Sequence, residues 1–313
     1  MDKDSPIFVA GARGLVGSAI VRRLQSSGYK NVYSPSRQEL DLSDADQVRK
    51  YFERVKPEYV FIAAAKVGGI LANNTQPVEF LLENLKIQNT LIPVSYELGV
   101  RKLLFLGSTC IYPKFCEQPI KESALLSGPL EPTNEAYAIA KIAGIKLCQA
   151  YKKEYGFNAI CAQPTNLYGP NDNFSSTGSH VIPGLMRRII EAKEEKLEKI
   201  TCWGTGTPTR EFLYVDDLAD ACIFLMESYD GIDIVNVGTG DEISIADLTR
   251  LICEKVGWEG DIEWDTSKPD GTPRKVCDIS KLKSLGWSPK VNLAKGIELT
   301  LSWFKDHQDS IRT

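Results

Sequence analysis

The fold can be predicted from one stretch near the N-terminus, Pro6-Ile-Phe-Val-Ala10-Gly11-Ala-Arg13-Gly14-Leu-Val-Gly17-Ser-Ala-Ile-Val-Arg-Arg-Leu24. A short apolar run typical of a strand leads into a glycine-rich turn, and a helix-forming run follows. Glycines let the backbone approach a pyrophosphate, and the N-terminus of a helix attracts the anion. The spacing is G-x-x-G-x-x-G rather than the commoner G-x-G-x-x-G. We therefore expect the turn to bind a dinucleotide through Gly11, Ala12, Arg13, Gly14, Leu15, Val16 and Gly17.

Strand-like and helix-like patterns alternate through the first half of the chain. Expected strands are 6–10, 31–36, 59–64, a run beginning at 102, and 158–164, and expected helices include 42–55 and 77–98, the latter interrupted by Pro93. This alternation predicts an α/β fold, a doubly wound parallel sheet of the Rossmann type. Residues 1–170 would form the cofactor-binding domain.

The pattern loosens after about residue 170, where loops become longer. Later strand or helix pieces are expected at 200–203, 215–228, 234–237, 245–256 and 292–307, and 263–271 is expected to be a loop. Some of these pieces should complete the sheet. The remainder of residues 171–313 would form a smaller substrate-binding lobe.

Composition excludes several classes of protein. The chain has 313 residues, 43% of them hydrophobic, and a net charge of −4, which argues against a nucleic-acid surface. No apolar run approaches the ~20 residues of a membrane span, and the N-terminus does not resemble a signal peptide. Eight scattered cysteines without a C-x-x-C pair suggest free thiols in a cytoplasmic protein. With two histidines and no His/Cys cluster, we expect no metal site.

Two further stretches suggest carbonyl chemistry. Tyr137 and Lys141 are four residues apart on a predicted helix, so both side chains leave the same face. A lysine beside a tyrosine favours the phenolate, and such a phenol can exchange a proton with a carbonyl oxygen. Ser108 and Cys110 follow a buried strand, and ligands bind at the carboxyl ends of parallel strands.

The glycine turn, the strand-end serine and the Tyr-x-x-x-Lys helix together resemble the extended short-chain dehydrogenase/reductase family. Further segments resemble the branch that converts GDP-4-keto-6-deoxy-D-mannose to GDP-L-fucose. They are Cys110-Ile-Tyr-Pro113, Ala63-Ala-Ala-Lys66-Val-Gly-Gly69, Glu131-Pro-Thr-Asn-Glu135, Pro164-Thr-Asn-Leu-Tyr-Gly-Pro170 and Ser179-His180-Val-Ile-Pro183. The glycine turn departs modestly from the pattern, with Ala12 where relatives often have histidine.

The second expected strand ends Ser34-Pro-Ser36-Arg37, without the acid that would bind the ribose 2′-hydroxyl of NAD. Arg37 and Arg13 can instead approach a 2′-phosphate, so we expect NADP(H). The resemblance places further residues around the cofactor. They are Asp41 and Leu42 near the adenine, Ala63, Ala64 and Ala65 along the cofactor backbone, Pro164, Thr165, Asn166 and Leu167 at the nicotinamide, and also Lys141 and His180.

The resemblance also implies roles in a reaction. Tyr137 would donate a proton to the C4 oxygen, Lys141 would lower the pKa of Tyr137, and Ser108 would bond the same oxygen. Cys110 as base and His180 as acid would invert C3 and C5, since cysteine and histidine both titrate near neutral pH. The GDP-sugar would be anchored by Arg188, Trp203, Arg210 and Asp270.

Three alternatives remain open at this point. The chain could be an NAD-dependent 4-epimerase or a dehydratase acting on a nucleotide sugar, another 4-keto reductase, or a cofactor-sensing regulatory module without catalysis. The missing acid after the second strand and the pair Cys110 and His180 argue against the epimerase. The retained Tyr137 and Lys141 argue against the module. The resemblance implies a homodimer with a four-helix interface, formed by the Tyr137 helix and the long helix before it, and apolar residues such as Ile142 and Ile145 are expected on outward faces.

Overall fold

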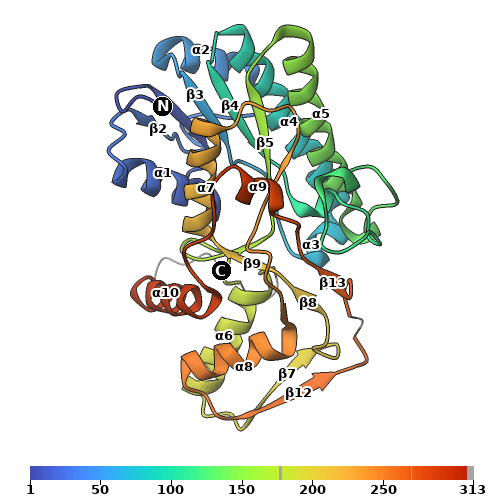
Figure 1. Cartoon of the computed structure of the whole chain (residues 1–313). Coiled ribbons are helices and arrows are strands. Elements are labelled where there is room, and N and C mark those ends of the chain that lie inside the picture. Colours follow the sequence, from blue (N-terminus) through green and yellow to red (C-terminus); the bar gives the residue numbers. More distant parts are fainter. Residues whose placement is uncertain (176–177, 269, 309–313) are drawn as a thin grey trace.

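A six-stranded parallel sheet forms the upper half of the protein in Figure 1. The computed structural model describes residues 1–175, 178–268 and 270–308. The strand order is β10-β5-β4-β3-β1-β2. The strands are β1 (Ile7–Ala10), β2 (Val32–Tyr33), β3 (Tyr59–Ile62), β4 (Lys102–Leu106), β5 (Ala159–Pro164) and β10 (Val235–Val237). Every neighbouring pair is parallel, so the predicted doubly wound α/β sheet is confirmed.

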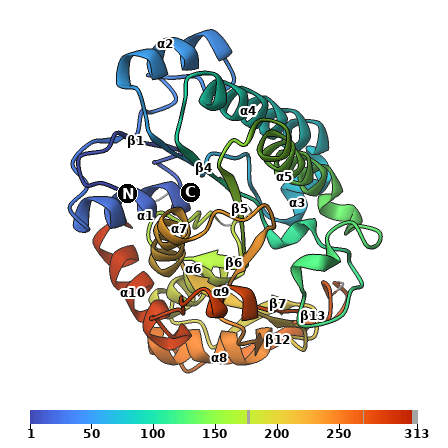
Figure 2. The same cartoon turned by 45° about the horizontal axis from the view of Figure 1, so that its top comes forward.

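Helices cover both faces of this sheet (Figure 2). On β1, Ile7 and Val9 pack toward one face, while Phe8 and Ala10 pack toward the other. The first face is covered by α1 (Leu15–Ser26) and α7 (Val215–Ser228), and the second by α2 (Ala45–Val55), α4 (Pro77–Glu97) and α5 (Glu135–Tyr155). Because both faces of the sheet are buried, apolar residues occupy successive positions along the strands, without the alternation of apolar and polar residues seen in half-exposed sheets.

A separate hydrophobic cluster forms the lower part of the molecule in Figure 1. Its helices are α6 (Val181–Glu194), α8 (Ile245–Val256) and α10 (Leu293–Asp306), and its two-stranded sheet consists of β7 (Lys199–Trp203) and β12 (Asp261–Asp265). Shorter elements join the two parts or lie near their junction. They are α3 (Ile70–Thr75), β6 (Asn166–Tyr168), β8 (Thr209–Arg210), β9 (Phe212–Tyr214), β11 (Ile243–Ser244), β13 (Arg274–Lys275) and α9 (Ser280–Ser284).

Several predicted boundaries were wrong. Pro93 does not interrupt its helix, because α4 runs unbroken from Pro77 to Glu97. A proline removes one backbone hydrogen bond, and the burial of Leu91, Ile92 and Val94 on either side of it holds the helix together. Tertiary packing therefore overrides the local preference.

The expected loop 263–271 begins inside a strand. Residues 261–265 form β12, which pairs with β7 in parallel. The alternation of polar and apolar residues in this segment is too short to distinguish a strand from a loop. Pairing with β7 stabilises the strand. The second expected strand is only Val32–Tyr33, and the next helix starts at Ala45, capped by the Asp44 side chain. Within the described ranges, no helix combines the length and the apolar character that crossing a bilayer requires.

Candidate active site

The glycine turn lies where β1 and β3 meet, which is the point at which the strand order reverses. Gly11 has φ +84°, and a Cβ on it would lie 2.7 Å from the Ala64 backbone nitrogen. A Cβ on Gly17 would lie 2.1 Å from the Gly11 carbonyl oxygen. Gly14 caps α1 without any side-chain bond, which leaves the first N–H groups of the helix open to a ligand. These features fit a dinucleotide phosphate group.

The remaining residues predicted around this turn surround the same end of the sheet. Ala12 and Arg13 lie within the turn, Leu15 and Val16 begin α1, Ala63, Ala64 and Ala65 follow β3, and Asp41 and Leu42 follow β2. Leu42 packs partly into the core, while the Asp41 carboxylate accepts hydrogen bonds from Ser43 that keep its pKa below the usual range.

The loop after β2 does carry an acid, Glu39, beyond the strand end at Ser34–Arg37 where none was expected. The Glu39 carboxylate accepts a hydrogen bond from the Ser36 backbone nitrogen at 2.7 Å. This bond, with a smaller contribution from Arg13, holds the pKa of Glu39 below its usual value. Arg13 donates to Gln38 at 3.2 Å, and Arg37 is exposed. Arg13 and Arg37 therefore border the loop after β2, and the Glu39 carboxylate in that loop is already hydrogen-bonded to the backbone.

Ser108 follows the carboxyl end of the central strand β4, as predicted. Its backbone nitrogen donates to Gln163 Oε1 at 3.0 Å, and its hydroxyl accepts from the Cys110 backbone nitrogen at 3.2 Å. Cys110 lies in a short 3₁₀ turn, Thr109–Ile111. The two predicted side chains thus occupy one tight turn after a central strand.

Tyr137 and Lys141 are both buried on α5. The Lys141 ammonium donates to the Leu106 carbonyl oxygen at 2.8 Å and lies 5.8 Å from the Tyr137 ring centre. Burial lowers the pKa of Lys141 to about 8.

Burial, with a smaller effect of Cys110, raises the pKa of Tyr137, although a hydrogen bond to Ser108 acts in the opposite direction. The prediction that Lys141 lowers the pKa of Tyr137 is therefore not met in this structure, because the ammonium faces a carbonyl and both groups are desolvated. The phenol is neutral at physiological pH and carries a proton that it can donate.

Sequence reasoning missed Lys275. Its ammonium donates a hydrogen bond to Cys110 Sγ at 3.7 Å. Lys275 lies in β13, which pairs with β8 so that Lys275 is opposite Arg210. A positive charge thus contacts the thiol expected to act as base, and the same strand pair carries one of the arginines expected to bind substrate. The long separation in sequence left no local signal for this contact.

His180 directly precedes α6 and makes no capping hydrogen bond with its side chain. Its ring Nδ1 lies 3.8 Å from Asp172 Oδ1. Asp172 was also missed, because the sequence Gly169-Pro-Asn-Asp172 reads as an ordinary turn.

The predicted substrate residues gather near the end of β7. Arg188 donates to the Thr201 carbonyl oxygen at 2.8 Å, and the exposed Trp203 ring has Lys268 above it. Asp270 accepts from the Thr205 backbone nitrogen at 2.9 Å. A Cβ on Gly271 would lie 2.9 Å from Arg210 Nη2, which places that guanidinium beside the same loop. Among the described contacts, Arg210 donates to its neighbour's carbonyl oxygen, that of Thr209, at 2.7 Å.

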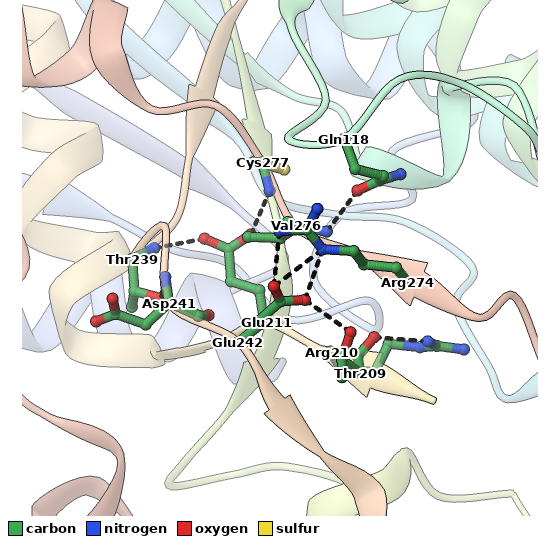
Figure 3. Close-up of polar contacts among 10 residues, drawn as sticks. All are labelled: Gln118, Thr209, Arg210, Glu211, Thr239, Asp241, Glu242, Arg274, Val276 and Cys277. Atoms are coloured by element: carbon green, nitrogen blue, oxygen red, sulfur yellow. Dashed lines mark hydrogen bonds and ion pairs between the residues drawn. The ribbon is translucent and has the colours of Figure 1, made fainter. Parts of the chain in front are cut away.

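The Glu211 carboxylate, which no sequence pattern singled out, ties three segments together (Figure 3). It is fully buried, and its two oxygens accept from the backbone nitrogens of Thr239 at 2.6 Å, Gly240 at 2.7 Å and Cys277 at 2.9 Å. Its own nitrogen donates to the Lys275 carbonyl oxygen at 3.3 Å. Glu211 therefore fixes the strand that carries Lys275.

The same residue also fastens the segment predicted to line the nicotinamide. The Glu211 carbonyl oxygen accepts from Thr165 Oγ1 at 3.4 Å and from Asn166 Nδ2 at 2.8 Å. Pro164 ends β5, and Leu167 continues into β6. Nearby, Glu242 accepts from Thr209 and pairs with Arg274 at 2.7 Å on a more exposed surface (Figure 3).

Comparison with known proteins agrees with this architecture. Residues 7–238 match the model of the NAD dependent epimerase/dehydratase family. The chain is 59% identical to GDP-L-fucose synthase 1 of Arabidopsis thaliana, over 97% of this chain and 94% of that protein. It is 48% identical to the GDP-L-fucose synthase of Escherichia coli K12, over 98% of each.

A solved structure of a GDP-L-fucose synthetase from Naegleria fowleri bound to NADP superimposes with a TM-score of 0.93 at 31% identity, covering 100% of this chain and 96% of that one. On sequence, site geometry and fold together, the chain belongs to the NAD dependent epimerase/dehydratase family.

Proposed function

We propose that the protein converts GDP-4-keto-6-deoxy-D-mannose to GDP-L-fucose by epimerisation at C3 and C5 and NADPH-dependent reduction at C4. Several relatives that match over nearly the whole chain, at 48–59% identity, bear the name GDP-L-fucose synthase, and the superimposed Naegleria structure holds NADP. The tightly packed glycine turn and the arginines Arg13 and Arg37 fit NADP(H) as the cofactor. When bound, NADPH supplies the hydride.

In the reduction, Tyr137 donates its proton to the C4 oxygen as negative charge develops there. A neutral, buried phenol is suited to this because its proton is present at physiological pH. Ser108 lies next to it and hydrogen-bonds the same oxygen. Lys141 holds the nicotinamide ribose and adds positive charge to the site.

The contact between Lys275 and Cys110 is the observation that carries the epimerase half of the proposal. Hydrogens at C3 and C5 of a 4-keto sugar are acidic because the carbanion delocalises into the carbonyl. Cys110, with the Lys275 ammonium 3.7 Å from its sulfur, removes such a proton as a thiolate. His180 returns a proton to the opposite face of the carbon. A plain reductase has no need of this cation and thiol beside its tyrosine.

The GDP portion is held by the lower part of the molecule. Arg188 and Arg210 offer forked donors to the two phosphates, and the exposed Trp203 ring offers a face for stacking on the base. Asp270 accepts from donors of the ribose or base. Residues 1–170 are proposed as the cofactor domain, to which α7 and β10 return, and the rest of residues 171–313 as mainly the substrate-binding lobe.

The protein is also proposed to be a cytoplasmic homodimer that pairs through α4 and α5. The outward faces of these helices expose Val78, Leu82 and Ile139, which are 67%, 48% and 45% accessible. Ile142 and Ile145, which sequence analysis placed outward, are buried at 8% and 0%. The exposed apolar residues on these helices are therefore different from the two first expected. A monomer mass in sedimentation at micromolar concentration would reject the dimer.

The proposed function is tested by supplying the enzyme with NADPH and GDP-4-keto-6-deoxy-D-mannose and identifying the product. We expect one NADPH to be oxidised per sugar, and proton couplings in the NMR spectrum of the product to match GDP-L-fucose. A product that is reduced at C4 but retains the manno configuration at C3 and C5 would identify a simple 4-keto reductase. Reversible C4 inversion without net NADPH consumption would identify a 4-epimerase.

A further inference from the structure

A buried carboxylate lies behind the half-exposed His180. Asp172 is 3% accessible, and its Oδ1 lies 3.8 Å from His180 Nδ1, while the His180 side chain is 47% accessible. Asp172 Oδ1 also accepts from the Asn173 backbone nitrogen at 2.7 Å. Its second oxygen, Oδ2, has no hydrogen-bond partner among the residues that the structure describes. Burying an acceptor without a donor is unfavourable, so this oxygen is suited to a donor that arrives during the reaction.

The loop that carries Asp172 is held in place from two sides. The Asp172 backbone nitrogen donates to the Gly169 carbonyl oxygen at 3.2 Å, and Gly169 has φ +144°. Asn171, itself at φ +65°, donates through Nδ2 to Ser18 Oγ at 3.1 Å. Ser18 belongs to α1, directly after the glycine turn. The carboxylate is therefore fixed relative to the cofactor-binding turn, while the His180 side chain is far more accessible than the carboxylate.

The charges around His180 single out Asp172. The Asp172 carboxylate raises the pKa of His180 above the ordinary 6.5, and this outweighs burial, which acts in the opposite direction. Charged side chains on the neighbouring segments are engaged elsewhere in the described part of the chain. Arg187 on α6 pairs with Glu191 at 2.7 Å, and Lys66, before α3, pairs with Glu79 at 3.1 Å.

We propose that Asp172 is a positioning residue that accepts the Nδ1 proton of His180 in a hydrogen bond and so directs His180 Nε2 toward the sugar. This rests on the proposed epimerase function of His180. A separation of 3.8 Å is longer than a hydrogen bond, but a small rotation of the half-exposed ring closes it, and such contacts commonly tighten when substrate binds.

The step is balanced in protons. The Cys110 thiolate takes a proton from C3 or C5 and becomes a thiol, and the imidazolium Nε2–H gives its proton to the opposite face and becomes neutral imidazole. Nδ1–H stays on the ring, held by Asp172, so the tautomer that remains can accept a proton only at Nε2. Exchange with solvent then restores the thiolate and the imidazolium for the second carbon.

The test is a pH titration of the two histidines by NMR, using histidine labelled with ¹³C in wild type and in Asp172→Asn. The chain has only His180 and His307, and His307→Asn assigns the signals. Asparagine keeps an acceptor for the Asn173 nitrogen but carries no charge. We expect the His180 midpoint to fall by about 0.5 to 1 pH unit in Asp172→Asn. The His307 midpoint should be unchanged, which also verifies folding of the variant.

The kinetic arm uses epimerisation measured by proton exchange at C3 and C5. Protonated His180 is lost as pH rises through its midpoint, so Asp172→Asn should move the alkaline limb of the rate profile to lower pH. Its kcat should fall about tenfold or more, with the KM for the GDP-sugar within about twofold. An unchanged His180 midpoint or an unchanged alkaline limb would overturn the role of Asp172. Absence of exchange in wild type would instead overturn the proposed epimerase function, whatever the titration shows.

Discussion

The Lys275 ammonium donates to Cys110 Sγ at 3.7 Å across 165 residues of sequence. Cys110 follows β4 in the cofactor half, whereas Lys275 lies in β13, which is paired with β8 of the substrate side. The proposed base of epimerisation is therefore completed by a residue from a distant segment. A thiolate base carries a negative charge, and the Lys275 ammonium lies where it can stabilise that charge.

The first prediction concerns this cation. Lys275→Met should slow deuterium exchange at C3 and C5 by roughly ten- to a hundredfold, since a hydrogen bond to a charged group contributes about 1.5–3 kcal/mol. Lys275→Arg keeps the charge and should recover most of the rate. If Lys275→Met exchanges as fast as wild type and only the KM for the GDP-sugar rises, Lys275 binds phosphate rather than serving the base.

Tyr137→Phe should separate the two half-reactions. It deletes the proposed proton donor but keeps the buried ring, so NADPH oxidation should fall by about 10²–10⁴-fold. Exchange at C3 and C5 should continue within about threefold of wild type, because that step uses Cys110 and His180. NADPH affinity, measured by fluorescence, should be nearly unchanged. A loss of reduction smaller than about tenfold would remove Tyr137 from the role of general acid.

Arg37→Ala should change the choice of cofactor. Arg37 is exposed at the end of the β2 region, where only NADPH presents a 2′-phosphate. The KM for NADPH should rise by about tenfold or more while the KM for NADH changes little. Parallel changes in both constants would place Arg37 away from the phosphate.

Glu211→Gln should destabilise the protein far more than a matched change nearby. Glu211 is fully buried and accepts three backbone N–H bonds, and glutamine lacks one of the acceptor oxygens. We expect a loss of about 2–4 kcal/mol and a Tm lower by about 5–10 °C.

The control is Glu242→Gln, which breaks an ion pair with the exposed Arg274 in the same region (Figure 3). Such surface pairs contribute about 0–1 kcal/mol, so its Tm should stay within about 3 °C of wild type. Equal stability of the two variants would contradict the assignment of Glu211 as the group that fastens β13.

The sheet and the residues at its strand ends could be predicted because their signals are local. The apolar run 6–10, the glycine turn and the four-residue spacing of Tyr137 and Lys141 each fit within one element. Parallel strands then bring their carboxyl ends to one edge, which explains why Ser108 and the turn at Gly11 lie at the same edge of the sheet.

The remaining contacts could not be predicted because they join distant segments. Lys275 and Glu211 gain their significance only from the pairing of β13 with β8, a two-residue match that no periodicity reveals. The protonation of Tyr137 was misjudged because spacing on a helix says nothing about where an ammonium points, and Lys141 bonds to the Leu106 carbonyl instead. Asp172 could not be predicted because its importance comes from its proximity to His180, whereas its own sequence context is that of an ordinary turn.

Inversion of C3 and C5 by Cys110 and His180 before reduction can be followed by hydrogen exchange with the solvent. Wild type is incubated in D₂O with GDP-4-keto-6-deoxy-D-mannose and no NADPH, and deuterium at each carbon is followed by NMR. We expect incorporation at both C3 and C5, strong slowing at both carbons in Cys110→Ser, and loss of inversion in His180→Gln, with some exchange retained if Cys110 still removes a proton. Both variants should still bind NADPH. Exchange at the wild-type rate in Cys110→Ser would contradict this account and leave the protein a simple 4-keto reductase.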